Sequence, residues 1–368
     1  MIYRWIAIFL GALCITTGTV SAQEISGGDV NTITTAVPFL TITPDARHGG
    51  MGDAGVATSP DVNAQYWNQA KLVWNEKEVG FAVNYTPWLR NLVPDIALSY
   101  LNGYYKINDV SAVGGSLRCF SLGDIQFTDE FGNNTIQFRP NEWALDASYS
   151  RLLSERLSGG LNLRFIYSNL TGGIDVGNAQ TKPGLGIAAD ISVYYQNDDI
   201  TLGGTDATLA FGGIISNIGN KMSYSNLDEQ DFLPMNFRVG PRITLHLDDY
   251  NDVSFHFDVN KLLVPTPPVY DTDPSSPSFG SLLAGQDPNR SVANAMFTSW
   301  YDAPGEVLFD EQGEPLLNDD GTQQVRDGSV LQEEFRELFF GFGAEYWYDQ
   351  IFAFRAGYFT EHAAKGNR

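Results

Sequence analysis

The chain has 368 residues, and its 22 Lys and Arg against 44 Asp and Glu give a formal net charge of −22. This acidity disfavours nucleic acid as a partner, because phosphate binding needs clustered cations. Aromatic residues make up 13% of the chain and glycines number 37. Beyond the N-terminus no apolar run approaches the roughly 18 residues of a membrane-spanning helix, whereas the composition fits a transmembrane β-barrel.

Residues 1–22 are predicted to be a secretory signal peptide. Arg4 supplies the positive n-region, a short apolar stretch follows, and Val20-Ser21-Ala22 forms a small-residue cleavage site before Gln23. The apolar stretch is too short, and wrongly flanked, for a transmembrane helix. The chain is therefore expected to be exported and to begin at Gln23 when mature.

The two cysteines point to a fold without a disulfide. Cys14 lies in the apolar stretch of the signal, and Leu13 stands before it where a lipoprotein signal needs a small residue. Cys119 alone then remains in the mature chain, so a disulfide within the chain is excluded. Packing and strand pairing must close the exported fold.

A glycine-rich stretch, Gly50-Met51-Gly52-Asp53-Ala54-Gly55, matches the G-x-G-x-x-G pattern of dinucleotide-binding loops. That pattern needs a buried strand before it and a helix after it. Pro44 and Asp45 break any preceding strand, and no helical period follows. We instead interpret the small residues as a tightly packed hatch, residues 23–75, that enters the lumen of a barrel. The predicted hatch residues are Gly50, Met51, Gly52, Ala54, Trp67 and Asn68.

Residues 76–368 are predicted to form an all-β, antiparallel transmembrane barrel. Alternation of apolar with small or polar residues, the period-two signal of strands, recurs eleven times. The segments are Val79–Tyr85, Ile96–Tyr100, Val113–Leu117, Trp143–Tyr149, Leu157–Tyr167, Leu185–Tyr195, Leu209–Ile215, Phe237–Leu247, Val253–Val259, Leu338–Tyr346 and Phe352–Tyr358.

The connections between these segments alternate in length, as outer-membrane barrels require. The short links are residues 106–111, 154–158, 196–206, 248–252 and 349–350. The long links are residues 123–142, 169–183, 217–235 and 264–336, and the first outer link, residues 86–95, is of modest length. A soluble β-sandwich would also alternate, but it has no reason to sort its loops in this way.

Charges fall on the inward parity of the predicted strands, since a charge facing lipid would cost a few kcal/mol. The predicted lumen-lining residues are Arg118, Arg164, Arg238, Arg242, Asp258, Glu345 and Arg355, joined by Asp146 and Asp190. They are interpreted as an ion-paired wall, with a selectivity lining for a solute as the alternative. His246 and His256 also point inward, without a third metal ligand. No catalytic motif appears, so the sequence predicts no enzyme, no cofactor and no metal site.

The residues carry a family resemblance. The stretch ARHGGMGDAGVATSPDVNAQYWNQAKL, residues 46–72, resembles the hatch of the FadL family of outer-membrane barrels, although Asn68-Gln69-Ala70 replaces that family's Asn-Pro-Ala. Phe257–Pro268, Ser299–Gly305 and Gly343–Phe359 resemble the PorV family, FadL-like barrels of the type IX secretion system of Bacteroidetes.

The resemblance implies a barrel of about fourteen strands, so that about three closing strands are expected beyond Arg368. It also implies an outer-membrane protein that is not an enzyme. Such proteins bind the C-terminal signal domain of secreted cargo and cap the lateral opening of the type IX translocon barrel (SprA/Sov). They then carry cargo to an attachment complex that contains the sortase-like PorU. Expected partners are thus outer-membrane lipid, translocon, cargo domains and attachment complex.

The longest link, residues 264–336, is predicted to be an extracellular partner-binding loop, because loops of this length are usually functional. From Asp302 to Glu334 it holds ten acidic residues and one Arg. The predicted contact residues are Pro265, Pro267, Pro268, Trp300, Tyr301, Asp302 and Pro304. The alternatives are a solvated loop without a partner, a purely structural barrel, and a FadL-type transporter of long-chain fatty acids or other hydrophobic solutes.

Overall fold

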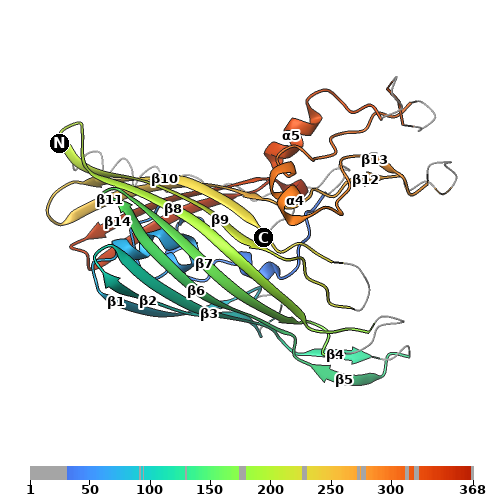
Figure 1. Cartoon of the computed structure of the whole chain (residues 1–368), viewed down its shortest axis with the longest axis horizontal. Helices are drawn as coiled ribbons and strands as arrows, with labels where there is room; N and C mark the ends of the chain where they lie inside the picture. Colours follow the sequence, from blue (N-terminus) through green and yellow to red (C-terminus); the bar gives the residue numbers. More distant parts are fainter. Residues whose placement is uncertain are drawn as a thin grey trace.

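The computed structural model describes residues 31–90, 93, 95–128, 131–173, 180–225, 230–271, 274, 279–310, 315–318 and 323–365. The predicted signal peptide lies outside these residues. Within them, eleven strands form one antiparallel sheet in which each strand pairs with its neighbours along the chain (Figure 1). The strands are β1 (Val79–Pro87), β2 (Ile96–Asn108), β3 (Ser111–Leu122), β6 (Asn141–Ser154), β7 (Leu157–Asn169), β8 (Gly184–Leu202), β9 (Thr205–Gly219), β10 (Asn236–His246), β11 (Asn251–Leu262), β14 (Leu338–Tyr348) and β15 (Phe352–Thr360).

Burial along the strands is inverted relative to a water-soluble sheet. In β7, Leu161 and Leu163 are 57% and 66% exposed, while Asn162 and Arg164 between them are 1% and 4% exposed. Apolar side chains thus face outward and polar side chains face an interior. This inversion confirms the predicted barrel wall and excludes the sandwich, whose apolar residues would be inside. No helix among the described residues is both long and apolar enough to cross a membrane.

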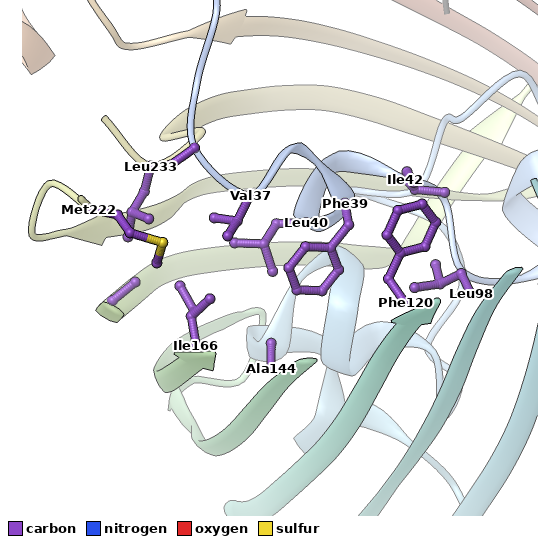
Figure 2. Close-up of a cluster of buried hydrophobic side chains, with 12 residues drawn as sticks. Val37, Phe39, Leu40, Ile42, Leu98, Phe120, Ala144, Ile166, Met222 and Leu233 are labelled. Carbon is purple, nitrogen blue, oxygen red and sulfur yellow. The ribbon is translucent and has the colours of Figure 1, made fainter. Parts of the chain in front are cut away.

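The N-terminal segment fills the interior of the curved sheet. It forms η1 (Pro38–Thr41), α2 (Ala46–Gly49), α3 (Ala64–Trp67) and η2 (Gln69–Trp74). Figure 2 shows Val37, Phe39 and Leu40 meeting inward wall residues such as Ile166. Phe39 stacks on Phe120 with ring centroids 6.1 Å apart. The interior is therefore a packed core between hatch and wall.

The long connections lie at one end of the sheet, which we call the long-loop rim (Figure 1). The connection 123–142 carries a hairpin of β4 (Ile125–Thr128) and β5 (Asn134–Phe138). The connection 264–336 carries β12 (Val269–Tyr270), β13 (Leu282–Ala284), α4 (Val292–Thr298) and α5 (Ser329–Arg336).

One predicted link was wrong. Residues 196–206 are not a loop, because β8 and β9 run through them and are joined only by Gly203-Gly204. Both glycines have positive φ, 59° and 88°, as a tight two-residue hairpin turn requires. The polar residues before the turn pair with β9 without apolar alternation, so the sequence pattern misses this part of β8.

Candidate functional site in the plugged lumen and the long-loop module

The hatch is fastened to the wall by an ion-pair cluster around the buried Glu345. Arg47 in α2 donates through Nη2 to Glu345 Oε2 of β14 at 2.8 Å and through Nε to Oε1 at 3.0 Å. Its Nη1 also pairs with Asp61 of the hatch at 3.0 Å. Arg355 of β15 approaches the same Glu345 at 2.7 Å. A bidentate arginine–carboxylate contact of this kind fixes orientation as well as charge.

A second tether holds the glycine-rich stretch. Asp258 Oδ2 of β11 accepts the backbone N–H groups of Gly55 at 2.8 Å and Val56 at 2.9 Å. Asp258 is 1% exposed, so the carboxylate sits inside the lumen against the hatch backbone. The end of the G-x-G-x-x-G stretch is therefore hydrogen-bonded to a carboxylate of the barrel wall.

Two glycines of that stretch lie where a side chain would not fit. A Cβ on Gly55 would lie 2.1 Å from the Trp67 ring, and one on Gly52, whose φ is 65°, would lie 2.5 Å from the backbone of Tyr358 in β15. Met51, which precedes Gly52, and Ala54, which precedes Gly55, are fully buried. Gly50 follows α2 as its C-cap residue.

Asn68 and Gln69 replace the expected Asn-Pro turn with side-chain bonds. Asn68 Nδ2 donates to the carbonyls of Val56 and of Val193 in β8, both at 2.9 Å. Gln69 Nε2 donates to Asp190 Oδ2 at 3.3 Å. The departure from the family pattern thus adds a contact between hatch and wall instead of loosening the turn.

A network of polar side chains lies wholly inside the hatch. Asp45 Oδ1 contacts His48 Nδ1 at 2.7 Å, and His48 Nε2 contacts Thr58 Oγ1 at 3.0 Å. Lys71 donates to that same hydroxyl at 2.8 Å, and Trp67 Nε1 donates to Asp45 Oδ2 at 2.8 Å. All five side chains are buried, so these hydrogen bonds stabilise the interior of the hatch.

Paired charges cross the centre of the lumen. Arg164 of β7 lies 2.6 Å from Asp146 and 3.0 Å from Asp190, which belong to the strands on either side of β7. Arg118 of β3 donates to the carbonyl of Leu40 in the hatch at 2.9 Å. The wall charges therefore pair with each other and with the plug.

The remaining predicted lumen residues also face inward. Arg238 lies over the Trp67 ring at 4.5 Å and donates to Asn260, and Arg242 donates to Gln196 at 3.0 Å. A cavity of about 40 Å³ lies between hatch residues, Arg118, Arg164 and Arg238. That volume holds about three waters at most.

The two inward histidines do not meet. His246 is the last residue of β10, its side chain is 42% exposed, and its Nδ1 is 2.7 Å from Asp252. His256 is buried at the middle of β11, beside Ser254 at 3.1 Å. No metal-binding group of three or more His, Cys, Asp or Glu occurs among the described residues.

The connection 264–336 folds into a compact unit, which we call the long-loop module: residues 264–271, 274, 279–310, 315–318 and 323–337. The module is attached to the wall at Lys261 of β11. From its position in the strand, the Lys261 side chain points to the outer, lipid-facing side of the wall, yet Lys261 is only 1% exposed. Lys261 Nζ lies 2.9 Å from Glu334 and 2.7 Å from Glu337. Lys365, beyond β15, pairs with Glu337 at 3.0 Å and with Glu333 at 2.7 Å. The module thus covers the outer face of the wall at the long-loop rim.

Helix α5 is amphipathic, but it buries a charged residue and exposes apolar residues, the reverse of a helix on a water-soluble protein. Glu334 points inward, where its Oε1 accepts the N–H of Ala303 at 2.9 Å, whereas Leu331 and Phe335 are 62% and 61% exposed. Leu331 and Phe335 are four residues apart and so share one face of the helix. The module therefore buries charge and presents an apolar face.

The predicted partner-binding residues divide into two groups. Asp302, Pro265 and Pro304 are buried inside the module, and Pro267 and Pro268 are half-buried. Burial raises the pKa of Asp302 to about 6, although Arg290 lies 3.4 Å away and opposes the shift. These residues hold the module together and do not face outward.

Trp300 and Tyr301 remain accessible, at 45% and 59% exposure. Trp300 packs edge-on against Phe237 of the wall, with ring centroids 5.6 Å apart. Lys261 Nζ lies 5.7 Å from the Trp300 ring on the same side. The aromatic pair is thus anchored on the wall at one side and open at the other.

An internal repeat escaped the sequence prediction. Residues 305–328 contain three eight-residue units, GEVLFDEQ, GEPLLNDD and GTQQVRDG. One residue near the middle of each unit joins a closed ring of backbone hydrogen bonds. The N–H of Leu308 donates to the carbonyl of Gln324, that of Leu316 to the carbonyl of Leu308, and that of Gln324 to the carbonyl of Leu316, at 2.7–2.9 Å. We call the described part of this stretch the knob. The recurring Gly at spacing eight was the available sequence signal.

The family model for the type IX secretion system protein PorV matches residues 25–269, which is more than half of the chain. The chain belongs to the PorV family. Its sequence matches no curated protein.

Solved structures similar to this PorV-family chain include hydrocarbon channels. The toluene transporter TodX of Pseudomonas putida is 10% identical, covering 90% of this chain and 85% of its own, with a TM-score of 0.41. The toluene transporter TbuX of Ralstonia pickettii is 11% identical over 90% and 87%, with a TM-score of 0.38. The monoaromatic hydrocarbon channel CymD is 13% identical over 85% and 82%, with a TM-score of 0.39.

Membership of the PorV family places the chain in the outer membrane as a component of type IX secretion. The matched residues include the hatch and the wall from β1 to β11. The knob, α4 and α5 lie beyond residue 269. Most of the long-loop module, together with β14 and β15, therefore lies outside the residues that the family model matches.

Proposed function

We propose that this PorV-family chain binds the C-terminal signal domain of secreted cargo at its long-loop rim, which faces the cell exterior. In the same proposal it caps the lateral opening of the translocon barrel and delivers cargo to the PorU-containing attachment complex. The observation that carries the proposal is the long-loop module, a folded unit that buries ion pairs and exposes Trp300, Tyr301, Leu331 and Phe335.

The plugged lumen supports binding at the rim. The hatch is held by Arg47 and by Asp258, and the cavity above it is about 40 Å³. A folded cargo domain has no room inside a barrel of this size. The exposed surface available to it is the rim.

The exposed side chains suit a protein partner. Tyr and Trp are frequent anchors at interfaces, and truncating a central anchor commonly costs about 2 kcal/mol or more. The knob adds Phe309 and Leu317, 53% and 55% exposed. Because the module is already folded, little ordering entropy opposes binding.

The test is the double substitution Trp300→Ala with Tyr301→Ala. Cargo-domain pull-down should weaken by about 30-fold, which corresponds to about 2 kcal/mol, and cargo should stop reaching the cell surface. The matched control is Phe131→Ala in the β4–β5 connection, since Phe131 is 81% exposed at the same rim. Wild-type pull-down and secretion in the double variant would overturn the proposal.

The second candidate is a FadL-type transporter of hydrophobic solutes, favoured by the hatch inside the barrel. It predicts that long-chain fatty-acid uptake depends on the protein and is unchanged by the Trp300 and Tyr301 substitutions. Uptake measured in cells with and without the gene separates the two functions.

A further inference from the structure

A groove crosses the outward face of β10, β11, β14 and β15. Ala344 and Ala356 stand directly opposite each other in β14 and β15 and therefore point to the same side. The next outward pairs along these strands are aromatic on both sides: Phe342 opposite Tyr358, and Tyr346 opposite Phe354. The two small side chains leave a notch that Phe342 and Tyr358 border.

The notch continues across the neighbouring strands. Phe255 of β11 stands opposite Ala344, and Ile243 of β10 stands opposite Phe255. Phe257 forms a wall beside Phe342, with ring centroids 4.9 Å apart. The resulting groove measures about 580 Å³. Its outward lining is apolar, and the two polar residues that border it, Arg242 and His256, belong to the lumen side.

The hatch backs the groove from inside. Gly343 and Gly357 are opposite each other with inward parity, and a Cβ on Gly357 would lie 2.0 Å from the backbone of Met51. A Cβ on Gly343 would meet Met51 at 2.8 Å. The wall here is a single backbone layer between hatch and groove. Since the packed hatch supports it, the groove is preformed rather than collapsed.

The position of the groove along the strands indicates which part of the membrane it contacts. Ala356 is the central residue of β15, Phe352–Thr360, and Ala344 lies near the middle of β14, Leu338–Tyr348. The middle of a spanning strand lies in the hydrocarbon region, beyond the reach of a headgroup. The groove is continuous with the exposed apolar face, and Phe354 and Tyr358 stand out from it at 70% and 66% exposure.

We infer that this groove is a binding site for one acyl chain of an outer-membrane lipid. Its walls are the protruding aromatic rings, and its floor is the Ala344–Ala356 pair. A neighbouring barrel would have to enter between those rings with a convex wall, whereas a single hydrocarbon chain fits lengthwise. The site is separate from the rim and stands independently of cargo binding.

The test uses the full chain in nanodiscs that contain a phospholipid with a photoreactive diazirine in its acyl chain. After illumination, mass spectrometry locates the labelled peptides. Labelling should concentrate on residues 342–344 and 356–358 relative to the lipid-facing residues of β6 and β7. Ala344→Phe with Ala356→Phe fills the notch, and we expect the excess labelling to fall roughly fivefold or more.

The matched control is Ala147→Phe on β6, an outward position between Gly115 and Leu163. It should leave the labelling excess at β14 and β15 unchanged. If the double variant does not insert, the milder Ala356→Leu should give a partial loss. Even labelling over all outward strands in the wild type would overturn the inference. So would an excess that survives filling of the notch, or cross-links between two chains in its place.

Discussion

Removing the charge at Lys261 should detach the long-loop module from the wall. In the structure Lys261 is buried beside Glu334 and Glu337, at 2.9 and 2.7 Å. Lys261→Met keeps most of the volume but leaves two buried carboxylates with less compensation. Breaking a buried ion pair by removing one partner costs about 3–5 kcal/mol. Lys365 still neutralises Glu337, so we take the lower end, about 3 kcal/mol.

The assay is amide hydrogen exchange in α5, measured on the protein in nanodiscs. A loss of about 3 kcal/mol raises the opening equilibrium, and with it the exchange rate, by about 150-fold. The matched control is Arg326→Met, which removes an ion pair with Glu306 whose side chains are 52% and 56% exposed. Such surface pairs contribute about 0–1 kcal/mol, so exchange should change by less than about fivefold.

A second variant checks the mechanism. If the cost comes from an uncompensated carboxylate, adding Glu334→Gln to Lys261→Met should recover part of the lost protection. Exchange in α5 that stays within about tenfold of wild type in Lys261→Met would refute the reasoning. It would mean that apolar packing alone holds the module in place.

Three further predictions concern other parts of the chain. Because burial raises the pKa of Asp302 to about 6 in the fold, the contribution of Asp302 to module stability should be fully present below about pH 4 and lost as pH rises through 6; Asp302→Asn should remove this contribution from the pH dependence of the module's protection factors. Gly55→Ala should destabilise the hatch by about 1–3 kcal/mol, because its Cβ would meet the Trp67 ring at 2.1 Å. Gly49→Ala, whose nearest contact is 3.7 Å, should cost far less in the same thermal unfolding assay. Mass spectrometry of the mature protein should find its N-terminus at Gln23, and a retained signal or an acylated cysteine would contradict the export prediction.

The wall was predictable because lipid imposes a strict rule on every strand. Apolar residues outside and polar residues inside give a period of two, so the inward parity of Arg164 and Asp258 could be assigned from the sequence alone. The rule fails where the strand leaves the membrane. The part of β8 near Gln196 pairs with β9 but is polar on both faces, so it resembles a loop.

Contacts between distant segments could not be predicted in the same way. Nothing near Lys261 in the sequence shows that a lysine with outward parity is covered by α5. Asp302 resembled an exposed acidic loop residue, yet it is buried because the module folds around it. The eight-residue repeat from Gly305 was readable, but without a hydrophobic period it gave no sign of its hydrogen-bonded ring.

The tethers of the hatch have a consequence for biogenesis. Arg47 finds Glu345 298 residues further along the chain, and Gly55 finds Asp258 203 residues further. The N-terminal segment is synthesised first, whereas β14 and β11, which carry these two tethers, are synthesised much later. Closing loops of this length before any contact forms is slow. The segment therefore cannot complete its docking until β11 and β14 are in place. We expect completed docking to be a late step of maturation in the outer membrane.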